Sequence, residues 1–173
     1  MKSEILIWLF PIIFMIHEFE EIIFMRWWLG NNREPILSKY PNLGKRVLGQ
    51  FESFSTEAFS FIVAEEFLIV SIVVLFSVFT NNYDLYLGLV VAYFIHLLTH
   101  LIQTIVIRKY TPGIITTLLT GIFCIFVFSG LIDSGLLSFN STFIYSIVLT
   151  LVVFMNLKFM YYVANKIKIL NIK

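Results

Sequence analysis

Charged residues are scarce in this chain of 173 residues. Lysine, arginine, aspartate and glutamate make up 13% of it, against 59% hydrophobic residues, and the mean hydropathy is +0.90. A core of this size cannot bury so much apolar surface, which excludes a soluble globular domain. Twelve basic and eleven acidic residues leave no basic excess, which argues against a nucleic-acid partner. The single cysteine, Cys124, excludes an internal disulfide.

The sequence contains several long apolar segments. About 30 Å of hydrocarbon is crossed by roughly 20 apolar residues in a helix. Five segments meet this length, at about Glu4–Trp28, Glu57–Phe79, Leu85–Ile107, Gly113–Ile132 and Thr142–Ala164. No small-residue cleavage site follows the first run, so we expect it to be retained rather than removed as a signal peptide. The sequence therefore predicts an all-α fold, a polytopic membrane helix bundle of about five transmembrane helices, with residues 1–173 forming a single domain.

The basic residues indicate how the helices are oriented. They gather in the long polar connection at about 30–56, in the connection after the third span and in the C-terminal tail. They are Arg33, Lys39, Lys45, Arg46, Arg108, Lys109, Lys166, Lys168 and Lys173. The connections near 80–84 and 133–141 contain none. The positive-inside rule thus predicts a multi-pass protein of the cell membrane with its N-terminus outside and its C-terminus in the cytoplasm. The connection at 30–56 is either a segment lying on the membrane surface or a plain solvated loop.

Ionisable side chains of three predicted spans fall at one depth. They are His17, Glu20 and Glu21 in the first span, Glu65 and Glu66 in the second, and His96 and His100 in the third. With a rise of about 1.5 Å per residue, all of them lie roughly 10–17 Å from the same membrane face, because successive spans run in alternate directions. The sequence therefore predicts one polar layer in the cytoplasmic half of the bundle.

Their spacing places these groups on shared helix faces. His17, Glu20 and Glu21 stand at i, i+3 and i+4, and His96 and His100 at i and i+4. Glu18 points about 100° away from its neighbours' common face, so it is left out of the predicted cluster. Only one member of the Glu65–Glu66 pair can face the cluster.

Burying so many polar groups requires an explanation. Each ionisable group at the centre of a membrane helix costs about 2.5–3.5 kcal/mol, so half a dozen facing lipid would cost on the order of 15 kcal/mol. They must face one another, a cavity or a cation. Imidazole and carboxylate together suit a divalent metal, with zinc favoured and iron or manganese as alternatives. The predicted ligands are His17, Glu20 and His100, with His96 or Glu65 completing the set. Hydrogen-bonded packing without a metal is the structural alternative.

Two blocks of sequence carry a family resemblance. The first is His17-Glu18-Phe19-Glu20-Glu21. The second runs from His100 and Gln103 through Arg108, Tyr110 and Pro112-Gly113 to Thr116. Together with the order of the helices, they resemble the HXXEE family of small bacterial membrane proteins over about residues 5 to 130. His96 departs from the family pattern, in which asparagine is common. The family has little established function, so the resemblance supports the site rather than a reaction. A weaker similarity is to intramembrane CAAX-type proteases, which also use a Glu-Glu pair and later histidines.

The second block also predicts a substrate contact. Arg108 and Tyr110 immediately precede a helix that Pro112-Gly113 opens, and the free backbone N–H groups of a helix start bind anions. The predicted substrate-binding residues are Gln103, Arg108, Tyr110 and Thr116. A helix cap combined with positive-inside topology is the simpler alternative.

The leading functional hypothesis is a membrane-embedded, metal-dependent hydrolase. It would act on a lipid-like or other hydrophobic substrate entering from the cytoplasmic leaflet, with Glu21 as the general base. A dinuclear iron oxidase is the nearest enzymatic alternative, because carboxylate-bridged iron sites draw ligands from several helices. A small cation or proton transporter would use the same cluster, although no internal repeat supports it.

Overall fold

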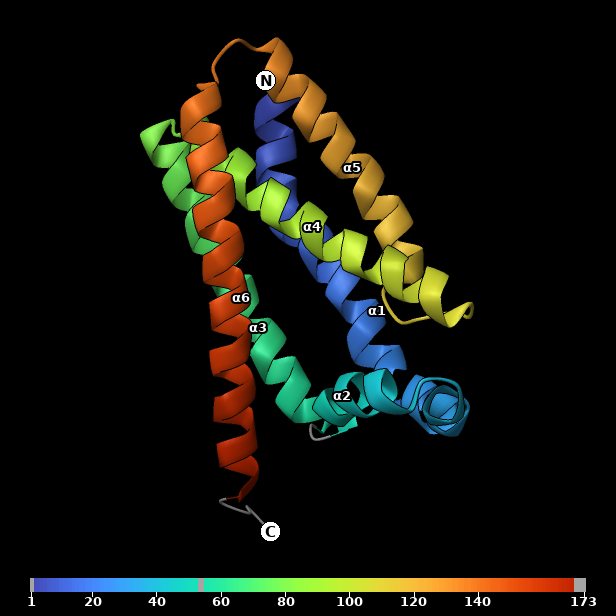
Figure 1. Cartoon of the computed structure of the whole chain (residues 1–173). Helices are drawn as coiled ribbons and strands as arrows, with labels where there is room; N and C mark the ends of the chain where they lie inside the picture. The colour runs from blue at the N-terminus through green and yellow to red at the C-terminus, as the bar shows by residue number, and fades with distance from the viewer. Residues whose placement is uncertain (1, 53–54, 170–173) are drawn as a thin grey trace.

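All regular structure in the described chain is α-helical. The computed structural model describes residues 2–52 and 55–169 (Figure 1). The helices are α1 (Lys2–Lys39), α2 (Pro41–Glu52), α3 (Thr56–Thr80), α4 (Tyr83–Ile107), α5 (Ile114–Asp133) and α6 (Phe139–Ile169). The prediction of an all-α bundle is confirmed.

Four helices are long and apolar enough to cross a membrane: α3, α4, α5 and the part of α6 from Phe139 to Ala164. They coincide with the last four predicted spans to within a few residues. The first predicted span, Glu4–Trp28, lies inside α1, whose apolar run is interrupted by three closely spaced glutamates. Those glutamates are buried within the bundle, so α1 carries its polar residues toward the other helices rather than toward lipid.

The polar connection predicted at about 30–56 is helical where the structure describes it. Helix α1 continues past Gly30 to Lys39, and α2 follows after Tyr40. Leu48 of α2 is buried against a small apolar cluster on α1 that includes Trp28 and Ile36. The plain loop alternative is therefore wrong for residues 30–52, while residues 53–54 lie outside the described part.

Helices α1 and α4 each make contacts with several other helices. Helix α4 packs against α3, α5 and α6, and α1 packs against α2, α3 and α5. The main apolar core surrounds the first half of α1 and includes Phe10, Tyr86 and Val127. The smaller cluster around Trp28 lies further along the same helix. Residues 17–21 of α1 thus lie between two apolar regions along the helix, and the polar side chains of this segment are buried there.

Candidate metal centre

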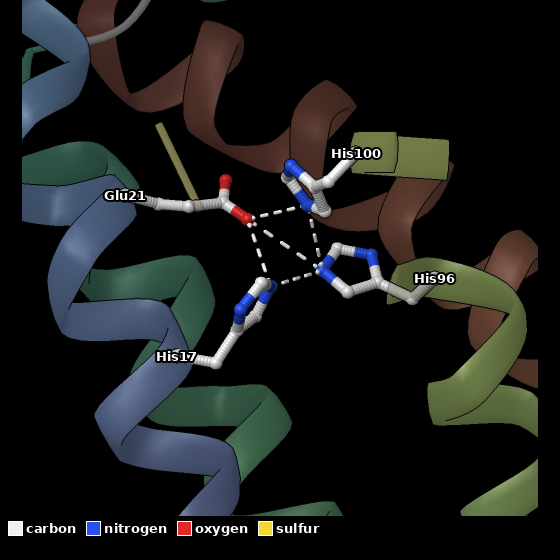
Figure 2. A group of neighbouring side chains, drawn as sticks. All are labelled: His17, Glu21, His96 and His100. Carbon is white, nitrogen blue, oxygen red and sulfur yellow. Dashed lines mark hydrogen bonds and ion pairs between the residues drawn. The ribbon is translucent and has the colours of Figure 1, made fainter. Parts of the chain in front are cut away.

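Four ionisable side chains from two helices converge on one point. His17 and Glu21 belong to α1, and His96 and His100 to α4, each pair separated by one helical turn. Each side chain offers one donor atom, and the four atoms all lie within 4.8 Å of one another (Figure 2). His17, Glu21 and His100 are buried, while the His96 side chain is 32% exposed. The cluster contains all three histidines of the chain.

Five of the six distances between the four donor atoms are short. The Nε2 atom of His96 lies 3.1 Å from Nε2 of His17 and 3.1 Å from Nε2 of His100. The Oε1 atom of Glu21 lies 2.8 Å from Nε2 of His100, 3.4 Å from that of His17 and 3.5 Å from that of His96. Ligands bound tetrahedrally to zinc at about 2.0–2.1 Å are roughly 3.3 Å apart. These five distances are close to that separation, so the four donors are near enough to bind one metal ion.

Outer hydrogen bonds fix the tautomers of two imidazole rings. Nδ1 of His100 donates to the carbonyl oxygen of Pro112 at 3.1 Å. Nδ1 of His17 lies 3.0 Å from the hydroxyl of Thr116, which itself donates to Oε2 of Glu20 at 2.6 Å and so accepts from His17. In neutral rings with protonated Nδ1 atoms, both Nε2 atoms carry lone pairs directed at the cluster.

These lone pairs need a positive partner. Oε1 of Glu21 is buried and has no hydrogen-bond partner within the described residues, although it points at the same centre. A proton on one of the rings would satisfy one contact, whereas a cation at the centre satisfies all four donors. Orphaned buried acceptors are costly, so the donor set fits a metal ion.

Glu20 lies outside this group. Its carboxylate accepts hydrogen bonds from the Tyr110 hydroxyl at 2.8 Å and from the backbone N–H groups of Ile115 and Thr116 at 3.3 and 2.8 Å. It therefore occupies the start of α5, the place where the sequence predicted an external anion. Burial and the neighbouring carboxylate raise the pKa of the Tyr110 phenol, which stays protonated and donates to Glu20. The contact of Glu20 with the cluster is indirect, because Glu20 accepts from the Thr116 hydroxyl and that hydroxyl accepts from His17.

A close backbone approach holds α5 against the cluster. Gly113, immediately before α5, has a φ of 89°, a region that favours glycine. A Cβ atom there would lie 2.9 Å from Nδ1 of His100 and 3.1 Å from Cε1 of His17. The absence of a side chain at Gly113 lets the helix start contact both rings.

A pocket of about 210 Å³ opens beside the cluster. Its walls come from four helices and are mostly apolar. The lining residues of α1 and α4 include Phe14, Glu18, Glu21, Tyr93, His96, His100 and Gln103, and those of α3 and α6 include Phe59, Glu66, Asn156 and Tyr161. Apolar pockets with a few convergent polar groups are typical of small-molecule sites.

Four other predicted site residues lie outside the cluster and the pocket. Glu65 accepts a hydrogen bond from the amide of Asn156 at 2.9 Å, and it is Glu66 that lines the pocket. Arg108 is exposed and ends α4 in a left-handed conformation. Tyr110 and Thr116 contact Glu20, as described above. Of the four predicted substrate contacts, only Gln103 lines the pocket.

Glu18 is the residue that sequence reasoning missed. Its side chain is 5% exposed, and its Oε1 lies 3.8 Å from Nε2 of His96, at the edge of the cluster. The helical spacing correctly turns Glu18 away from the face that carries His17, but the pocket extends around that side of α1. The free-energy cost of its position could have revealed Glu18 from the sequence. A glutamate inside a membrane helix is unfavourable wherever it faces lipid, so it is expected to face a polar site.

Comparison with known proteins identifies a matching family but no function. A family model described as "Protein of unknown function with HXXEE motif" matches residues 8–128, which include all four donors. No curated protein and no solved structure matches the chain.

Proposed function

Because the chain belongs to the HXXEE family, whose function is unknown, we propose its function from the site itself: a membrane-embedded, metal-dependent hydrolase for a lipid-like substrate. The observation that carries this proposal is the convergence of three imidazole nitrogens and one unpartnered carboxylate oxygen on one point. The adjoining apolar pocket supplies a place for the substrate. The primary test is the metal content of the purified protein.

The proposed metal ligands are His17, Glu21, His96 and His100. Three nitrogen donors and one oxygen donor favour zinc, while iron and manganese also accept this donor set. When bound, such an ion polarises a carbonyl group and lowers the pKa of water to about 7. Compared with the sequence-based assignment, Glu21 replaces Glu20 as the carboxylate ligand, because Glu20 is engaged at the start of α5.

Glu18 is then the candidate for proton transfer. Its carboxylate lies beside His96 and lines the pocket, close to the donors without being one of them. We propose that Glu18 takes a proton from water as the water oxygen bonds to the substrate carbonyl carbon. When the carbon–oxygen bond of an ester breaks, Glu18 returns that proton to the departing alcohol. The step consumes one water and leaves the glutamate unchanged.

Thr116 offers a test of the outer contacts. Thr116→Val removes the hydroxyl that fixes the His17 ring, and we expect metal affinity to fall by about 10–100-fold, the usual effect of removing a partner of a metal ligand. Thr116→Ser keeps the hydroxyl and should bind metal almost as the wild type does. Competition with a chelating dye measures both. Equal affinity of the valine variant and the wild type would show that the contact to His17 does not orient the ligand.

Topology gives a further prediction. The basic residues predict that position 45 is cytoplasmic and position 82 external. Single cysteines introduced at these positions into a Cys124→Ala background should react with an impermeant reagent from opposite sides of the membrane. Labelling of position 82 from the cytoplasm would reverse the orientation and place the site in the external half.

A dinuclear iron oxidase is the second candidate. Glu18 and Glu66 provide two more carboxylates in the pocket that three of the four donors line, and carboxylate-bridged iron pairs use such sets. This alternative requires two equivalents of iron per chain. A single equivalent of metal would exclude it.

A further inference from the structure

Glu66 is a pocket carboxylate that the proposed hydrolysis does not use. It comes from α3 and lines the same pocket as Glu18 and Glu21. Within residues 2–52 and 55–169, no hydrogen bond reaches the carboxylate of Glu66 or of Glu18. The Glu18 side chain is 5% exposed, and the nearest histidine nitrogen is at 3.8 Å, beyond hydrogen-bond distance. Two carboxylates therefore line the pocket without a hydrogen-bond donor among the described residues.

None of the described lining residues can balance these carboxylates, because they include neither lysine nor arginine. A carboxylate in a low-dielectric pocket interacts strongly with a positive partner, so a positive ligand beside Glu66 is favoured over a negative one.

The remaining walls suit an ammonium group attached to an apolar chain. Phe14, Phe59, Tyr93 and Tyr161 all line the pocket. The faces of aromatic rings attract cations, and aromatic cages are a common way to bind quaternary ammonium groups. The volume of about 210 Å³ exceeds the roughly 150 Å³ that suffices for benzene in an apolar cavity. There is space for a head group or the end of a chain.

We propose that this pocket binds a single-chain amphiphile with a cationic, ammonium-type head group, which lies beside Glu66. The proposal rests on the proposed function, because it names the substrate class of the same site. It also excludes anionic head groups. The start of α5 lies beside the cluster, but its backbone N–H groups at Ile115 and Thr116 already bind the Glu20 carboxylate instead of an external anion.

The test compares three ligands with the same chain and different heads. Decyltrimethylammonium, decanol and decyl sulfate are titrated into the metal-loaded protein in a non-ionic detergent, and native mass spectrometry counts the bound molecules. We expect the ammonium ligand to bind at least about tenfold more tightly than the sulfate. Glu66→Gln should reduce this preference to within about threefold. Glu57→Gln, which changes an exposed glutamate of the same helix, should leave it unchanged.

Each outcome is decisive. Equal binding of the three ligands by the wild type, or tighter binding of the sulfate, would overturn the inference, as would a Glu66→Gln variant with its preference intact. A Glu66→Gln variant that falls from two equivalents of metal to one would overturn it too, because Glu66 would then be a metal ligand. Metal content is measured on the same samples. Absence of metal with the ammonium preference intact contradicts the proposed hydrolase alone, and loss of the preference with metal present contradicts the inference alone.

Discussion

Protein purified without added metal is expected to contain about one equivalent of a transition metal per chain, and His100→Ala is expected to contain almost none. Among the proposed ligands, His100 is closest to Glu21, at 2.8 Å, and its Nδ1 atom donates to the Pro112 carbonyl oxygen. Its loss removes one of four donors and leaves the Glu21 oxygen facing a void. Elemental analysis of protein in detergent measures the result directly.

The control for this experiment must come from outside the cluster, because the chain has no other histidine. Glu57→Gln serves, since Glu57 is exposed on α3. Circular dichroism and gel filtration show whether each variant remains folded and monodisperse. Folded wild-type protein that neither retains nor binds a divalent metal would reject the metal centre, and the contacts among the three rings would then be explained by a shared proton.

Glu18→Gln is expected to keep the metal and to lose turnover by about 10²–10⁴-fold, the usual contribution of a positioned acid–base group. Glutamine has nearly the same shape but cannot accept a proton from water. Glu21→Gln should behave differently and lose metal, because a neutral amide oxygen is a weaker donor than a carboxylate. A long-chain choline ester is a suitable substrate for the assay, since it combines an apolar chain, an ester bond and an ammonium group.

The comparison of the two variants separates proton transfer from ligation. Glu57→Gln again provides the matched control. If Glu18→Gln loses metal as Glu21→Gln does, Glu18 is a ligand and the two-iron alternative becomes the better explanation. If both variants keep metal and full turnover, the carboxylates of α1 have a structural role and the hydrolase proposal fails.

The meeting of α1 and α4 side chains could be predicted from the sequence, because helix periodicity and depth in the membrane are local properties. Spacing by one turn puts His17 with Glu21 and His96 with His100, and similar depth lets the two pairs meet. Periodicity could not separate Glu20 from Glu21, since both lie on the face of His17. That distinction depends on the start of α5, which lies more than ninety residues away in the chain and is in contact with Glu20.

The continuation of α1 to Lys39 could not be predicted from the sequence either, because it also depends on contacts between distant segments. Gly30 and the asparagines that follow it indicate a loop, yet the side-chain amides of Asn31 and Asn32 donate to the carbonyl oxygens of Trp27 and Trp28. These contacts are compatible with a continuing helix. Packing of the extended part against α2, as seen around Ile36, stabilises it. Packing between distant segments thus overrides the local preference for a turn.

The burial of three glutamates in α1 has a consequence for the order in which the protein assembles. Glu18, Glu20 and Glu21 belong to α1, and their partners on α4 and α5 are synthesised much later. Until then α1 carries polar groups that lipid does not satisfy. Helix α1 must therefore stay near the translocon or an insertion chaperone until α5 exists. A chain truncated after α4 would lack the donors for Glu20 and should be recognised by membrane quality-control proteases.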